Sequence, residues 1–110
     1  MGFRRGWHSA PYSRKMAEWT FMTNHTHVLV CLSTDPDLRI RDVAERVGIT
    51  ERATQRIVAE LTAGGYLEKS REGRRNRYRV IMTQPLRHPV EGTHSIGDLL
   101  RAVAGSPPLT

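Results

Sequence analysis

One segment of the chain, residues 40–57 (IRDVAERVGITERATQRI), restricts the fold more than any other. Its apolar residues recur at helical spacing on both sides of Gly48, which predicts two short helices joined by a tight turn. Glycine accepts the left-handed backbone that such a turn needs, and Thr50 is placed to cap the second helix. The residues expected to face the core are Val43, Ala44, Val47, Ile49, Ala53, Ile57, Val58 and Leu61. The second helix is therefore buried along one face only.

The opposite face of that second helix is polar and carries Glu51, Arg52, Gln55 and Arg56. A smaller helix holds it away from the body, and its exposed N-terminal half suits the major groove of DNA. Arginine pairs with guanine and glutamine with adenine, and Glu51 can accept from cytosine or favour the helix N-terminus. Thr50 can offer a cap and a phosphate contact. We therefore select these five residues as candidate DNA contacts.

The segment resembles a helix-turn-helix, with a small residue at Ala44 and the turn glycine at Gly48. Thr54 is a departure, because such motifs usually have Val or Ile at that position. A buried threonine can return its hydroxyl to a carbonyl one turn back, so the change weakens packing more than it affects the assignment.

A basic hairpin is predicted after this segment. Residues 66–71 and 75–82 alternate in the manner of strands, with a turn at Glu72-Gly73. Five arginines and one glutamate give residues 71–79 a net charge of +4. We expect Arg74, Arg75 and Arg77 to contact the DNA backbone or minor groove; a solvated basic surface is the alternative.

Together these features resemble a winged helix-turn-helix of the MarR-like or ArsR-like bacterial regulator type, over about residues 19–81. The resemblance implies an α+β, mainly α fold, in which a three-helix core carries an antiparallel β-wing and an extra C-terminal helix follows. It also implies sequence-specific binding of double-stranded DNA by a transcriptional regulator that is no enzyme. Repression by a homodimer is the simplest form of that activity.

We expect three parts along the chain. Residues 1–18 form a flexible basic N-terminal arm, in which Arg4 and Arg5 either reach a minor groove or have no role. Residues 19–83 form the winged DNA-binding domain. Residues 84–110 form a loop and a C-terminal helix that serves dimerisation.

Within the winged domain, the pattern predicts helices over about residues 24–33, 41–47 and 51–63. It also predicts that residues 38–40 make a short strand that pairs with the wing.

The last helix is predicted from its start signal, because Ser95 and Asp98 have the spacing of a capping box. In regulators of the resembled type, terminal helices build the dimer interface. The candidate dimer contacts are Trp19, Phe21, Ile96, Leu99, Leu100 and Val103. The alternative is that this helix packs on its own domain.

The composition agrees with a nucleic-acid partner and indicates the cellular compartment in which we expect the protein. The net charge is +6, and arginine supplies nearly all of the 17 basic residues, which suits bidentate phosphate and guanine contacts. The single cysteine, Cys31, excludes an internal disulfide and is expected to be a core thiol in a reducing compartment. No apolar run reaches membrane-spanning length and no signal peptide is recognised, so we expect a cytoplasmic protein.

No catalytic constellation, cofactor motif or metal site is predicted. Metal sensors usually carry Cys, His or carboxylate clusters three or four positions apart on a helix, and no such pair is identified, so the histidines are interpreted as surface residues. A small-molecule effector remains open. One alternative function is a ligand- or metal-sensing repressor. Another is a winged-helix interaction or assembly module, whose third helix would show apolar or acidic residues on its outer face.

Overall fold

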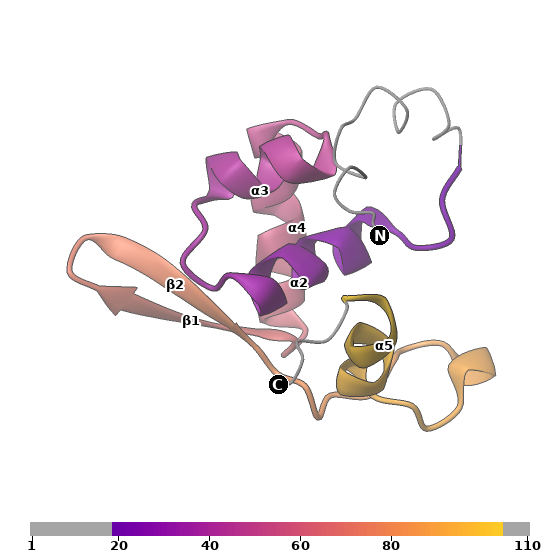
Figure 1. Cartoon of the computed structure of the whole chain (residues 1–110). Helices are drawn as coiled ribbons and strands as arrows, with labels where there is room; N and C mark the ends of the chain where they lie inside the picture. The colour runs from indigo at the N-terminus through magenta and orange to yellow at the C-terminus, as the bar shows by residue number, and fades with distance from the viewer. Residues whose placement is uncertain (1–18, 105–110) are drawn as a thin grey trace.

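The computed structural model describes residues 19–104 of the chain, so the N-terminal arm, including Arg4 and Arg5, lies outside the described residues. The elements in chain order are α2 (Asn24–Thr34), α3 (Ile40–Val47), α4 (Glu51–Ala63), β1 (Leu67–Glu72), β2 (Arg75–Val80), the 3-10 turn η2 (Pro89–Glu91) and α5 (Ile96–Val103). Within residues 19–104, three helices come first, a hairpin projects from them, and a last helix returns to the body (Figure 1). This is the predicted winged helix-turn-helix with an added C-terminal helix.

The turn between α3 and α4 has the predicted geometry. Gly48 adopts a φ of +88° and donates its N–H to the carbonyl of Ala44 at 2.8 Å. Thr50 caps α4, because its hydroxyl oxygen accepts from the N–H of Ala53 at 3.0 Å. Thr54 is completely buried and donates its hydroxyl to the carbonyl of Thr50 at 2.9 Å. The hydroxyl that departs from the motif is therefore satisfied inside the helix.

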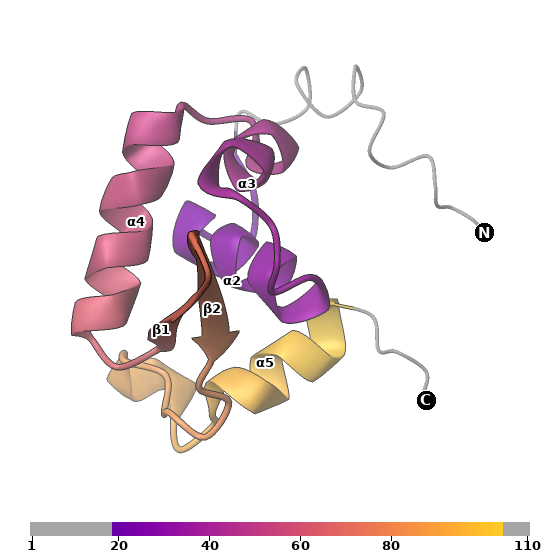
Figure 2. The ribbon, with the colours of Figure 1, turned by 90° about the vertical axis from the view of Figure 1, so that its left-hand side faces the viewer.

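One hydrophobic core joins all parts of the described chain. Helix α2 lies at its centre, between α3, α4, the hairpin and α5 (Figure 2). The buried residues of the core are Val28, Leu29, Leu32, Leu38, Val43, Ile57, Val58, Leu61, Tyr66, Leu67, Tyr78, Val80, Ile96 and Leu100. Since both α4 and the hairpin pack on α2, their relative placement is set by this core.

The wing is an antiparallel hairpin of β1 and β2. Its register runs from Leu67 opposite Val80 to Glu72 opposite Arg75, which leaves a two-residue loop. Gly73 begins that loop at a φ of +64°, a conformation that short hairpin loops require and glycine supplies. Its inner face is apolar at the base, as the alternation predicts, and the buried strand residues are Leu67, Tyr78 and Val80.

The predicted short strand at residues 38–40 is wrong. Ile40 already begins α3, and the sheet of the described chain contains only β1 and β2. Leu38 is buried in the core, and the N–H of Arg39 donates to the carboxylate of Asp42 at 3.4 Å. This capping contact at the start of α3 occupies the backbone that a third strand would use.

Helix α5 is fastened to the end of the wing. The N–H of Ile96 donates to the carbonyl of Gln84 at 2.8 Å, and the N–H of Gly97 donates to the carbonyl of Met82 at 2.8 Å. A Cβ atom on Gly97 would lie only 3.0 Å from that Met82 oxygen, so this close approach needs glycine. The capping box is also confirmed, since the hydroxyl of Ser95 accepts from the N–H of Asp98 at 3.1 Å.

Two of the predicted dimer contacts are buried within the subunit itself. Ile96 is 5% exposed and Leu100 is 2% exposed, because α5 covers a side of α2 that the three-helix core leaves open. The assignment of these two residues to a dimer surface is therefore corrected. Leu99 is half-buried, whereas Trp19, Phe21 and Val103 are exposed. The rings of Trp19 and Phe21 stack edge to face with their centres 5.0 Å apart.

The burial of α5 predicts a difference between two neighbouring leucines. We expect Leu100→Ala to lower the free energy of unfolding by about 2–5 kcal/mol, because it removes buried methyl groups and leaves a cavity. Leu99→Ala removes the same atoms from a half-buried position and serves as the matched control, with a smaller loss. Urea unfolding followed by circular dichroism measures both, and equal losses would contradict this placement of α5.

Candidate nucleic-acid interface

The outer face of α4 is open to solvent along its length. Its inner residues Thr54, Ile57, Val58 and Leu61 are buried. The helix lies along one margin of the molecule, with no other described element outside it (Figure 2). The predicted contact residues Glu51, Arg52, Gln55 and Arg56 are all exposed. The structure thus brings these four side chains together on one accessible surface.

Few of the described residues engage the N-terminal half of this surface. Within residues 19–104, no side-chain hydrogen bond or ion pair engages Arg52 or Gln55. Glu51 is in the first turn, where a carboxylate interacts favourably with the helix dipole. The hydroxyl oxygen of Thr50 accepts the capping hydrogen bond from Ala53, so its hydroxyl hydrogen can donate to a phosphate.

Arg56 differs, because it belongs to a chain of charges that links α4 to α2. Its NH1 atom is 3.5 Å from Oε2 of Glu60, and the other oxygen, Oε1, is 2.7 Å from Nε2 of His25. The hydrogen bond with His25 is the main cause that lowers the pKa of Glu60, and Arg56 acts in the same direction. The ion pair between Arg56 and Glu60 is exposed, so a phosphate can compete with Glu60 for Arg56.

The predicted arginines of the wing lie in two places, the loop at its tip and strand β2. Arg74 is exposed in the two-residue loop. Arg75 donates to the backbone carbonyl of Asp37, and Nε of Arg77 is 3.0 Å from Oδ1 of the same residue. Arg77 is also 3.8 Å from a carboxylate oxygen of Glu72. The contacts of Asp37 could not be predicted from the sequence, because no local pattern joins residues so far apart.

Two further basic residues extend the surface toward the tip of the wing. Lys69 lies opposite Tyr78 and Arg71 lies opposite Asn76, so both share the face of the hairpin that is buried at its base. Both are exposed. Leu67, Lys69 and Arg71 occupy every second position of β1 and therefore share one face. This spacing is visible in the sequence, but the prediction named only Arg74, Arg75 and Arg77.

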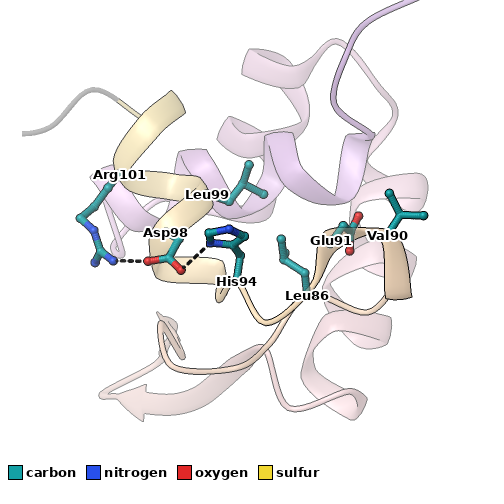
Figure 3. A pocket seen from close by; sticks show the side chains of 7 residues that line it. All are labelled: Leu86, Val90, Glu91, His94, Asp98, Leu99 and Arg101. Atoms are coloured by element: carbon teal, nitrogen blue, oxygen red, sulfur yellow. Dashed lines mark hydrogen bonds and ion pairs between the residues drawn. The ribbon is translucent and has the colours of Figure 1, made fainter.

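A separate hollow of about 590 Å³ lies between α5 and the loop before it. Leu86, Val90 and Leu99 give it apolar walls, and Glu91, His94, Asp98 and Arg101 give it charged ones. Figure 3 shows Asp98 between His94 and Arg101, with separations of 3.3 Å and 2.6 Å. The N–H of Ser95, then His94 and Arg101, lower the pKa of Asp98. The hollow is distinct from the surface of α4 and the wing.

The described residues also bear on metal binding and membrane insertion. His94 and Asp98 are four positions apart and in contact, but His94 precedes α5, so the two do not lie together on one helix. Within residues 19–104, no group of three His, Cys, Asp or Glu side chains is arranged to hold a metal ion.

Burial raises the pKa of the Cys31 thiol, and the charge of Arg46 acts in the opposite direction. No helix in the same range has the length and apolar character needed to cross a bilayer.

A helix-turn-helix with an exposed second helix and a basic hairpin beside it defines the winged-helix class of DNA-binding domains. The sequence agrees with this class, since the model of the MarR family matches residues 20–76, just over half of the 110 residues. The chain belongs to the MarR family, whose members are transcriptional regulators that bind DNA.

One solved structure similar to this chain is the crystal structure of the zinc-dependent MarR family transcriptional regulator AdcR in the Zn(II)-bound state. The two share 21% sequence identity with a TM-score of 0.46, over 80% of this chain and 51% of that one. The chain therefore spans about half the length of that regulator. No curated protein matches the sequence.

The link between α2 and α4 predicts a pH dependence. Because the pKa of Glu60 is lowered in the folded state, its carboxylate stabilises the fold at neutral pH, and this contribution disappears as the pH falls through that lowered value. We expect Glu60→Gln to reduce the melting temperature near neutral pH, and the difference from the parent chain to vanish in acid. Glu45→Gln on α3 is the matched control. Thermal melts over a pH series test this, and a difference independent of pH would contradict it.

Proposed function

We propose that the chain is a sequence-specific DNA-binding transcriptional regulator, which acts as a homodimeric repressor. Helix α4 enters the major groove, where Arg52, Gln55 and Arg56 contact bases and backbone, while Thr50 contacts phosphate and Glu51 accepts from cytosine. Arg74 and Arg75 hold the flanking backbone or minor groove. Occupancy of a promoter by such a dimer prevents transcription without any further activity.

The observation that carries this proposal is the open N-terminal half of α4 beside the wing. Arg52 and Gln55 are exposed side chains on a helix whose other face is fixed in the core. An assembly module would instead present apolar or acidic residues there. Arg74 stands at the tip of a hairpin whose base packs on the same core, so one folded unit offers groove and backbone contacts together.

The test is binding to a random pool of duplexes, followed by sequencing of the bound fraction and titration at several salt concentrations. We expect a defined motif and an affinity that falls steeply with salt, because phosphate contacts release counterions. Arg52→Ala should relax the preference at one base pair by about 1–3 kcal/mol. Arg74→Ala should weaken all sequences alike and reduce the salt slope by about 1.

Arg101→Ala is the matched control for these arginine variants, because it removes the same charge from α5, away from α4 and the wing. Its binding should stay close to that of the parent chain. If Arg52→Ala left the selected motif unchanged, the proposed docking of α4 would be wrong.

The homodimer is a separate expectation with its own measurement. Leu99, Val103, Trp19 and Phe21 remain as candidate contacts, since these apolar side chains are exposed or half-buried. We expect the chain to have twice its monomer mass of 12.5 kDa in light scattering, and Trp19→Ala with Phe21→Ala to shift it toward monomer. Thr62→Ala in α4 controls for an unspecific effect of substitution. A monomeric parent chain would contradict the dimer.

A further inference from the structure

Asp37 connects the helical body to the middle of the wing. It lies between α2 and α3, and its carboxylate oxygen Oδ1 is 3.0 Å from Nε of Arg77 in β2. Its backbone carbonyl also accepts a hydrogen bond from the guanidinium of Arg75. One residue of the body therefore holds two alternate residues of the same strand. We call this set of contacts, made by Asp37, Arg75 and Arg77, the wing clamp.

The wing clamp acts where the hydrophobic core no longer holds the hairpin. Tyr78 is the last buried residue toward the tip, and every described strand residue between it and the turn is exposed or half-buried. Arg74 lies four positions beyond Tyr78, which corresponds to about 14 Å at the rise of an antiparallel strand. A small rotation at the base would therefore move the tip by several times more than it moves the core residues.

We propose that Asp37 is a positioning residue for DNA binding, which fixes the angle between the wing and α4 through Arg77. With that angle fixed, Arg74 meets the backbone while Arg52 lies in the major groove. Arg77 then contributes to binding through Asp37, and this replaces the expectation that Arg77 itself contacts DNA. The proposal rests on the proposed function.

Because Asp37 is negatively charged, the wing clamp and a purely electrostatic effect predict opposite changes in DNA affinity when Asp37 is removed. A carboxylate near bound DNA repels phosphate, so removal of Asp37 should strengthen binding, or leave it unchanged, if the residue acts by charge alone. Its removal would also release Arg77 for a phosphate contact. The wing clamp predicts the opposite, namely weaker binding when this acid is lost.

The first experiment measures duplex affinity and its salt dependence for Asp37→Ala, Arg77→Ala and the double variant. We expect each single variant to bind about two- to fivefold more weakly, in the range of exposed ion pairs, and the double variant to bind no more weakly than either. The salt slope should change alike in Asp37→Ala and Arg77→Ala, and by less than the decrease of about 1 that follows outright removal of a phosphate contact, because Arg74 keeps its charge and is only held less firmly. Asp37→Asn, which keeps an oxygen acceptor for Arg77, should recover part of the loss.

Glu45→Ala is the matched control, since it removes an acid from α3 that forms no ion pair with any described residue. It should bind as tightly as the parent chain or more tightly. Unchanged or tighter binding by Asp37→Ala would overturn the wing clamp, and so would additive losses in the double variant with a salt slope that is reduced in Arg77→Ala alone.

The second experiment needs no DNA and separates the two proposals. Hydrogen exchange of the free protein should become faster at the amides of β1 and β2 near the turn in both Asp37→Ala and Arg77→Ala. The amides of α2 should exchange as in the parent chain, which shows that the fold is intact. Unchanged exchange in the wing overturns the wing clamp, whereas absence of DNA binding by the parent chain overturns the proposed function.

Discussion

The burial of α4 along a single face is the constraint on which the rest of the structure depends. Ile57, Val58 and Leu61 enter the core, and burial of such a side chain contributes about 1.5–3 kcal/mol to stability. The left-handed turn at Gly48 sets the direction in which the helix leaves α3. The core fixes both the position of α4 and its rotation about its own axis. The polar face of α4 therefore points away from the core in one defined orientation.

Local sequence signals predicted this part of the fold closely. The predicted third helix, residues 51–63, has the bounds of α4, because a cap at Thr50 and glycines after Ala63 define both ends. The turn at Gly48 and the alternation around Tyr78 were also readable, since each depends on neighbours within a few positions. The four exposed candidates on α4 follow from the same periodicity, and their accessibility in the structure is the strongest agreement.

Features that depend on distant residues could not be predicted in this way. Ile96 and Leu100 form an apolar stripe that fits a partner subunit as well as the subunit's own α2, and only the three-dimensional contact decides between them. Leu38 is apolar both in a short strand and as a core residue before α3. The contact of Asp37 with the wing leaves no local pattern, because its partners lie more than 35 positions away.

The arginines of this chain show why net charge alone does not describe a nucleic-acid surface. Arg77 and Arg79 are paired with carboxylates near the middle and base of the wing, whereas Arg74 at the tip and Arg52 on α4 have no carboxylate partner among residues 19–104. Arg56 is intermediate, because its exposed pair with an acid one turn away contributes only about 0–1 kcal/mol. A phosphate can replace that acid at little cost. The exposed basic residues without a carboxylate partner in the described range thus include Arg52 on α4 and Lys69, Arg71 and Arg74 along the wing, whereas the pair of Arg77 with Asp37 joins the wing to the body.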